Sequence, residues 1–303
     1  MIKHWLQLIR FPNLIIIALT QCLMQYLLLQ PILHRNHLNL VLKPSVFIQL
    51  VLLFVLAGAG GYIINDIKDR VIDSINKPDK LIVGNKISVS LAHNIYLISL
   101  IISTLIALNL STLFLKSLLI GFILNGLLWL YAYYLKQSVL MGNVTVAFLC
   151  AFTPAVLYWI EIDNMQQLKM QNFQAYQLLS FVFLTYVCMA FLTTLFREIV
   201  KDMEDVEGDK RGGCTTLPIV YGMDMAKKGA LAVGIALLVA VLTMIGHIER
   251  VGCQWYLVIT VFLPMLYALF FLQKATTKIE FSCLSKIAKG IMITGLCYIF
   301  WFI

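Results

Sequence analysis

Residues 46–73 read VFIQLVLLFVLAGAGGYIINDIKDRVID and join an apolar run to an acidic row. The run 46–64 carries no charge and is long enough to cross a bilayer as a helix, which takes roughly 20 apolar residues. Asn65, Asp69 and Asp73 follow it at i, i+4 and i+8, a spacing that places all three on one side if the helix continues. A chain with only 15 carboxylates therefore concentrates several of them where a membrane span ends.

The composition of the whole chain is that of an integral membrane protein. Its 303 residues are 61% hydrophobic and 13% charged, with a mean hydropathy of +0.88, far from the soluble range of about 25% charged residues. Backbone groups in lipid must be paired internally, so the apolar runs are expected to be helices. We predict an all-α polytopic fold of one domain, residues 1–303. The nine predicted spans are residues 12–30, 46–64, 89–108, 112–134, 139–160, 176–196, 229–246, 255–273 and 286–302.

The distribution of basic residues predicts the orientation. The first span is too long for a signal-peptide core of roughly 7–15 residues and is expected to be retained. With a cytoplasmic amino terminus, 18 of the 23 Lys and Arg residues lie on the cytoplasmic side, as the positive-inside rule requires. We therefore expect a multi-pass protein of a prokaryotic plasma membrane, with its chemistry on the cytoplasmic face. The net charge of +8 reports this topology, and no nucleic-acid partner is expected.

A second acidic row follows the sixth predicted span. The stretch KDMEDVEGD, residues 201–209, places Asp205 and Asp209 at i, i+4, with Asp202 one turn earlier on the same side. Eleven of the 15 carboxylates fall in the two cytoplasmic loops that follow the second and sixth spans. Because both loops lie on the same side of the membrane, the two rows are expected to face each other.

Such a concentration of carboxylates favours a divalent cation. Close like charges repel, and a bound cation removes the repulsion. The ligands are hard oxygens without His or Cys partners, which leaves Mg²⁺, Mn²⁺ or Ca²⁺, with Mg²⁺ preferred because it binds through carboxylates together with substrate phosphates. For either row alone, a solvated acidic loop is the alternative interpretation. The candidate metal ligands are Asn65, Asp66, Asp69, Asp73, Asp202, Asp205 and Asp209.

Basic residues are interleaved with both rows. Lys77 and Lys80 follow the first row, and Arg197 and Lys201 precede the second. Basic side chains that bind phosphate oxygens, next to carboxylates that hold metal ions, are typical of a diphosphate site.

These two motifs resemble those of the UbiA-type intramembrane prenyltransferases, which carry N-x-x-x-D-x-x-x-D after helix 2 and D-x-x-x-D after helix 6. The resemblance implies nine helices around a central cavity and a Mg²⁺- or Mn²⁺-dependent transfer of a prenyl group from its diphosphate to an acceptor, among membrane lipids. It also implies that Asp69, Asp73, Asp205 and Asp209 are the catalytic carboxylates.

Smaller matches extend the resemblance along the chain. Arg10 and Asn13 stand in RFPN, which opens the first span, and Lys136 ends the fourth. The spacing before Lys136 leaves both Tyr131 and Tyr133 as candidates to face the diphosphate, and a residue of the interfacial aromatic belt is the alternative for either. Where many members have Arg-Pro after the first motif, this chain has Lys-Leu at 80–81, so a bidentate contact becomes a point-charge contact. The predicted substrate-binding set is Arg10, Asn13, Lys77, Lys80, Tyr131, Lys136, Arg197 and Lys201.

The acceptor is predicted from the stretch REIVKDMEDVEGDKRGGCTTLP, residues 197–218. It looks most like the subgroup that adds a second geranylgeranyl group to geranylgeranylglycerol phosphate, and Arg197 and Lys201 suit an anionic acceptor. An aromatic or quinone-precursor acceptor, such as 4-hydroxybenzoate or dihydroxynaphthoate, is the alternative on the same scaffold. A divalent-cation transporter is a remote alternative, because it needs ionisable residues along a path through the bilayer and the central halves of the predicted spans hold no Asp or Glu.

Overall fold

The computed structural model describes residues 2–110, 113–247 and 251–302, apart from the side chains at 80, 114, 251 and 302. Within these residues the chain forms helices and no sheet. The helices are α1 (Ile2–Leu8), α2 (Phe11–Leu23), η1 (Met24–Leu29), α3 (Gln30–Arg35), α4 (Pro44–Lys68), α5 (Arg70–Asn76), η2 (Pro78–Lys80), α6 (Val89–Asn109), α7 (Phe114–Tyr133), η4 (Leu135–Gln137), α8 (Met141–Ile160), α9 (Ile162–Gln171), α10 (Phe173–Arg211), α11 (Leu217–Val220), α12 (Met223–Gly246), α13 (Val251–Leu257), η5 (Val258–Phe262), α14 (Leu263–Lys274), α15 (Lys278–Cys297) and η6 (Tyr298–Phe302).

The prediction of nine spans is confirmed. In the part of the chain that the structure describes, nine helical segments are long and apolar enough to cross a membrane. Two of their boundaries differ from the prediction in ways that matter for the site. Helix α10 continues to Arg211 instead of ending at 196, and α15 begins at Lys278 instead of 286.

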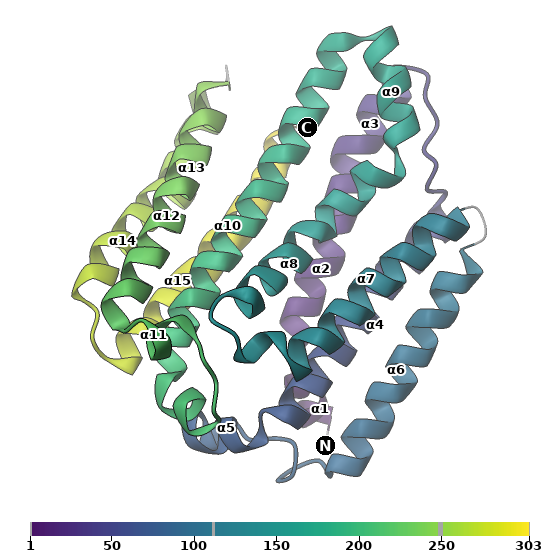
Figure 1. Cartoon of the computed structure of the whole chain (residues 1–303). Helices are drawn as coiled ribbons and strands as arrows, with labels where there is room; N and C mark the ends of the chain where they lie inside the picture. The colour runs from purple at the N-terminus through teal and green to yellow at the C-terminus, as the bar shows by residue number, and fades with distance from the viewer. Residues whose placement is uncertain (1, 111–112, 248–250, 303) are drawn as a thin grey trace.

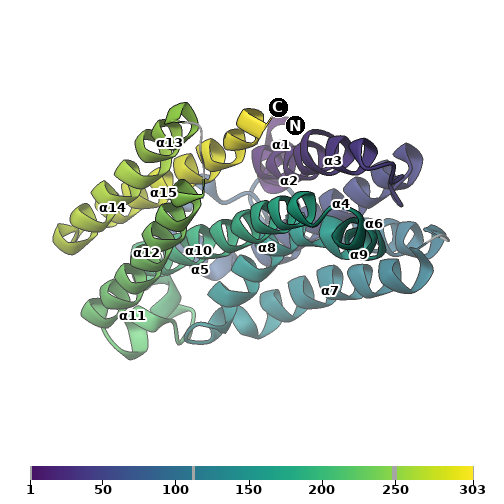
Figure 2. The same ribbon diagram turned by 90° about the horizontal axis from the view of Figure 1, so that it is seen from above.

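The helices pack as a bundle in which α10 has several neighbours. It packs against α8, α12 and α15, while α4 packs against α2, α6 and α7. Figure 1 shows α1, α5 and α11 gathered at one end of the bundle and α9 at the other. Seen from above, α10 lies between α8 and α12 (Figure 2). The ends of α4 and α10 that carry the acidic rows therefore share one end of the molecule.

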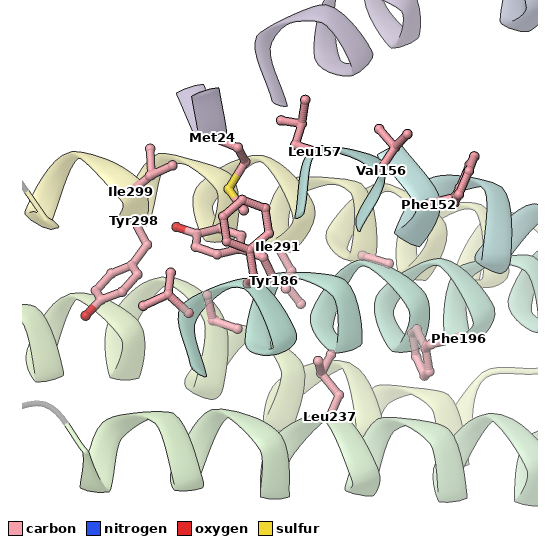
Figure 3. Close-up of a cluster of buried hydrophobic side chains, with 14 of the residues drawn as sticks. Met24, Phe152, Val156, Leu157, Tyr186, Phe196, Leu237, Ile291, Tyr298 and Ile299 are labelled. Atoms are coloured by element: carbon pink, nitrogen blue, oxygen red, sulfur yellow. The ribbon is translucent and has the colours of Figure 1, made fainter. Parts of the chain in front are cut away.

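Buried apolar side chains hold α10 against these neighbours. Phe196 of α10 and Leu237 of α12 are fully buried, and Tyr186 of α10 lies beside Ile291 of α15, with Met24 of η1 nearby (Figure 3). Between membrane-spanning helices, close van der Waals packing of this kind supplies the attraction, because lipid is as apolar as the side chains. This packing fixes α10 as a rigid support for the polar segment at its end.

The length of α10 places the second acidic row outside the hydrocarbon. At about 1.5 Å per residue, its 39 residues span about 58 Å, whereas the hydrocarbon core is about 30 Å thick. The helix ends where Gly213 takes a left-handed conformation (φ 74°) and the Cys214 N–H bonds the Asp209 carbonyl (2.9 Å). The predicted loop after the sixth span is therefore wrong over residues 201–209, which are helical.

Candidate active site

The first acidic row lies at the junction of α4 and α5. The sequence predicts one continuous helix, but the structure bends the chain at Asp69 (φ −82°, ψ 3°), which turns α5 toward α10. Helical hydrogen bonds still cross the bend, from the Asp69 N–H to the Asn65 carbonyl (2.8 Å) and from the Asp73 N–H to the Asp69 carbonyl (2.7 Å). The three side chains therefore keep their i, i+4 relation, and Asn65 Nδ2 donates to Asp69 Oδ2 (2.6 Å).

The second acidic row lies on one side of the α10 extension. Asp205 and Asp209 are separated by one helical turn, and Asp202 precedes them by three residues. Asn143, near the start of α8, donates through Nδ2 to Asp202 Oδ2 (2.8 Å). A neutral amide thus orients Asp202 without cancelling its charge.

Asn76 joins the two rows. At the end of α5, its Nδ2 donates to the Asp205 carbonyl (2.8 Å) and its Oδ1 accepts from the Gly208 N–H (2.9 Å). A Cβ at Gly208 would lie 2.4 Å from Asn76 Nδ2, so only glycine allows this approach. Lys278, the first residue of α15, donates through Nζ to the Asn76 carbonyl (2.7 Å). The prediction that the rows face each other therefore has a structural basis in contacts between α5, α10 and α15.

Two lysines pair with the rows. Lys136, in the short helix η4, forms an ion pair with Asp69, and Lys77 Nζ bonds Asp205 Oδ2 at 2.7 Å. Burial is the largest single influence and lowers the pKa of Lys136, but Asp69, Tyr131 and Asp73 together outweigh burial and the pKa is raised. Lys136 is therefore a permanent cation beside the first row.

The rows retain an excess of negative charge. Five carboxylates face two lysines, which leaves a formal charge of −3 from Asp69, Asp73, Asp202, Asp205, Asp209, Lys77 and Lys136. Burial raises the pKa of the Asp73 carboxyl, and the neighbouring Asp69 and Asp66 carboxylates raise it further. An added cation would relieve this repulsion.

The oxygen atoms of the rows fit Mg²⁺. Asn65 Oδ1 and Asp205 Oδ1 are buried and have no hydrogen-bond partner in the described structure. Among the described residues, Asp73 and Asp209 have no ion-pair partner, and no three His, Cys, Asp or Glu side chains converge closely enough to hold a metal by themselves. Mg²⁺ commonly binds through one or two carboxylates and completes its shell with substrate phosphates and water, so a site divided between two rows suits a metal bound with a diphosphate.

Asp66 is paired with Arg10, although its carboxylate lies near Asp69 and Asp73. Its Oδ1 accepts from Arg10 Nη2 (3.1 Å), and the Arg10 guanidinium stacks 4.7 Å from the centre of the Tyr62 ring. Arg10 takes a left-handed backbone conformation (φ 49°) between α1 and α2, which costs roughly 1–2 kcal/mol and aims its side chain at α4. Asp66 was predicted among the metal ligands; in the structure its Oδ1 pairs with Arg10, and its role as a metal ligand stays a prediction.

A second group of charged residues lies on α10 in the turns just before Asp202. Arg197 Nη1 bonds Glu198 Oε1 (2.6 Å) and Lys201 Nζ bonds Glu198 Oε2 (3.4 Å). Asn13 donates to the Tyr62 hydroxyl (3.2 Å). The predicted substrate-binding residues therefore divide into two groups, one at the acidic rows and one around Glu198.

The structure distinguishes the two tyrosines that the sequence leaves open. Tyr131 lies within electrostatic range of Lys136, Asp69 and Asp202, and so faces the site. Tyr133 stacks on Trp129 (4.9 Å between ring centres) and lies under the Lys68 ammonium, on another side of α7. The side chain of Lys80, also predicted to bind substrate, is outside the described residues.

Several site residues were missed by sequence reasoning. Asn76 and Asn143 lie in stretches that match the family, Asn76-Lys77-Pro78 and Gly142-Asn143, but they are neutral and were assigned no role at the site. Glu198 was counted among the loop carboxylates, and Lys289, which lies inside the predicted span 286–302, was counted only among the cytoplasmic cations. In the structure Glu198 is buried, and Lys289 Nζ donates to Asn13 Oδ1 (2.9 Å) from within α15.

Comparison with known sequences agrees with this site. Residues 37–288 match the model of the UbiA prenyltransferase family. A digeranylgeranylglyceryl phosphate synthase of Methanothermobacter thermautotrophicus is 35% identical over 64% of this chain, and the alignment spans 61% of that relative. A digeranylgeranylglyceryl phosphate synthase of Methanocaldococcus jannaschii is 30% identical over 96% of this chain and 93% of its own length.

Solved structures share the architecture. One, of digeranylgeranylglyceryl phosphate synthase in membranes, superposes with a TM-score of 0.63 at 26% identity and covers 98% of this chain and 96% of that chain. A UbiA homolog from Archaeoglobus fulgidus bound to GPP and Mg²⁺ gives a TM-score of 0.59 at 15% identity, over 98% of this chain and 99% of that chain, and shows the shared fold.

Proposed function

Because the chain belongs to the UbiA prenyltransferase family, we propose that it transfers a geranylgeranyl group from its diphosphate to geranylgeranylglycerol phosphate, as one intramembrane prenyltransferase domain. The observation that carries this proposal is the pair of acidic rows on α4–α5 and α10, tied together by Asn76 and lined with Lys77 and Lys136. The relatives named digeranylgeranylglyceryl phosphate synthase support the lipid acceptor over an aromatic or quinone-precursor acceptor.

The proposed metal ligands are Asn65, Asp69, Asp73, Asp205 and Asp209. Bound Mg²⁺ would neutralise the charge that develops on the departing diphosphate. A solved UbiA homolog bound to GPP and Mg²⁺ supports the choice of metal.

Lys77 and Lys136 bind the diphosphate oxygens in this proposal. Both ammonium groups are held beside the rows by carboxylates, so they are oriented before the substrate arrives. When the allylic C–O bond breaks, the diphosphate leaves with the electron pair, and the acceptor hydroxyl attacks the allylic carbon and passes its proton to water. The Tyr131 hydroxyl, near Lys136 and Asp69, is placed to donate a hydrogen bond to the departing group.

An apolar groove between α8 and α10 offers a place for the isoprenoid chain. Its volume is about 320 Å³ and its lining includes Phe148, Phe152 and Phe191. Phe191 lies seven residues before Glu198 on α10, about 10 Å along the axis, so the groove leads toward the polar end of the helix. Aromatic rings near the allylic carbon stabilise positive charge through their faces.

The protein is a multi-pass membrane protein, and we place it in the plasma membrane with the site on the cytoplasmic face. The placement of 18 of the 23 basic residues on the side of the acidic rows supports this orientation.

A competition experiment tests the proposed acceptor. Purified protein in lipid nanodiscs receives Mg²⁺, geranylgeranyl diphosphate and equal amounts of geranylgeranylglycerol phosphate and 4-hydroxybenzoate, and the products are identified by mass. We expect the diether lipid phosphate. A prenylated aromatic product without diether lipid would contradict the acceptor assignment, and the absence of any prenylated product would contradict the proposed activity.

A further inference from the structure

Four cations gather at the end of the bundle where α2, α10 and α15 meet. Arg10 precedes α2, Arg197 and Lys201 lie on α10, and Lys289 lies on α15. Lys289 and Lys201 both lie close enough to Arg197 and Arg10 to be repelled by their charges. We call these four residues, with Glu198 between them, the basic cluster.

The hydrogen bonds within the basic cluster leave strong donors available. Glu198 satisfies Arg197 Nη1 (2.6 Å) and lies 3.4 Å from Lys201 Nζ. Arg197 Nε is buried and has no hydrogen-bond partner in the described structure. A buried guanidinium N–H without an acceptor is costly, by about 1–3 kcal/mol or more, and an anion placed beside it removes that cost.

Lys289 has no carboxylate partner among the described residues. Among the described residues its one hydrogen bond is donation from Nζ to Asn13 Oδ1 (2.9 Å), a neutral amide. It lies eleven residues into α15, about 16 Å along the helix axis. The guanidinium groups of Arg10 and Arg197 repel the Lys289 ammonium at that position, and the neutral Asn13 amide compensates its charge only weakly.

The basic cluster and the acidic rows carry formal charges of opposite sign. In the basic cluster, four cations face Glu198 and Asp66, which leaves a formal charge of +2, whereas the acidic rows carry −3. A divalent cation and a diphosphate would bind at the acidic rows, so the positive excess of the basic cluster stays uncompensated. A phosphate monoester carries about −1.5 to −2 at neutral pH and matches the excess.

We propose that the basic cluster binds the phosphate group of the acceptor lipid and that Lys289 is a specificity-determining residue that contacts this phosphate. The inference rests on the proposed function and names the place of its second substrate. Glycerol separates the phosphate from the free hydroxyl by only a few bonds. Asp202, the nearest member of the second row, lies five residues beyond Arg197, about 7 Å along α10, so a phosphate at the basic cluster leaves the hydroxyl close to the donor site.

The test compares Lys289→Met with Lys286→Met on two acceptors. Lys286 lies on the same helix but is exposed and outside the basic cluster, so its variant is the matched control. The acceptors are geranylgeranylglycerol phosphate and its dephosphorylated analogue, and KM is measured for each acceptor and for the donor in nanodiscs. Thermal unfolding and the size-exclusion profile report folding.

We expect Lys289→Met to raise KM for the phosphorylated acceptor by roughly tenfold to a hundredfold, as for loss of a charge-assisted hydrogen bond. KM for the donor and for the dephosphorylated acceptor should change less than twofold, and Lys289→Arg should recover part of the loss. An equal loss with both acceptors would show that Lys289 only pins α15 to α2, and an unchanged KM for the phosphorylated acceptor would also overturn the inference.

A binding measurement separates this inference from the proposed function. Radiolabelled geranylgeranylglycerol phosphate is bound to the protein in nanodiscs without donor. If the wild type binds it, Lys289→Met does not, and neither protein makes product, the subsite stands and the proposed reaction fails. If the wild type makes diether lipid while Lys289→Met binds the acceptor normally, the reaction stands and the subsite fails.

Discussion

Removing the side chain of Asn76 should separate the two acidic rows. Its carboxamide donates to the Asp205 carbonyl (2.8 Å) and accepts from the Gly208 N–H (2.9 Å). At about 1 kcal/mol for each hydrogen bond, Asn76→Ala loses about 2 kcal/mol of coupling between α5 and α10. Because a misplacement of about 1 Å can lower a rate roughly a hundredfold, we expect kcat to fall by about that factor while the protein still folds.

Gly208→Ala tests the same coupling from α10. Its Cβ would lie 2.4 Å from Asn76 Nδ2, so Asn76 must move by about 1 Å to reach van der Waals contact. Gly126→Ala is the matched control, because a Cβ there meets nothing within 4 Å. The assay is the initial rate of radiolabelled prenyl transfer in nanodiscs, with the thermal midpoint as a measure of folding. Wild-type kcat and KM in both Asn76→Ala and Gly208→Ala would refute the coupling.

Three further outcomes are expected. Lys136→Met should lower kcat/KM for the prenyl diphosphate at least about tenfold, since a charge-assisted hydrogen bond contributes roughly 1.5–3 kcal/mol, and unchanged kinetics would remove Lys136 from the donor site. Glu161 is fully buried at the end of the bundle far from the site and accepts hydrogen bonds from the Val41 and Leu42 N–H groups. Glu161→Ala should therefore lower the thermal midpoint, while its KM values should stay at the wild-type level. EDTA should abolish transfer and added Mg²⁺ or Mn²⁺ restore it, whereas full activity in metal-free buffer would exclude a metal-bound diphosphate.

The spans were predictable because length and apolar composition determine them in a bilayer. The helical extension of α10 was not predictable from hydropathy, because hydropathy falls after residue 196. Lys, Glu and Met in this segment still favour a helix, but helix propensity alone does not show that one forms. Packing against α5 through Gly208 and Gly212 then decides that the extension forms, since a Cβ at Gly212 would lie only 2.5 Å from Ile72 Cγ1. Tertiary contacts of this kind cannot be read from hydropathy.

The acidic residues of the site were predictable because clustered carboxylates are rare in an apolar chain. Neutral residues that orient them, such as Asn76 and Asn143, carry no such signal. Lys289 was missed for a different reason. It lies inside the predicted span 286–302 and counts toward the cytoplasmic charge excess, and only the bond to Asn13 shows that it belongs to the site.

The central claim is that both acidic rows hold a divalent cation together with the donor diphosphate. Mn²⁺ can replace Mg²⁺ as a spectroscopic probe, so its binding to the purified protein is measured by electron paramagnetic resonance with an unreactive thiolo analogue of geranylgeranyl diphosphate. We predict that the wild type binds Mn²⁺ with the analogue and that folded Asp69→Ala and Asp205→Ala each lose at least about tenfold in affinity, as for loss of a bond to a charged group. Wild-type binding of Mn²⁺ and analogue in either variant would contradict the claim.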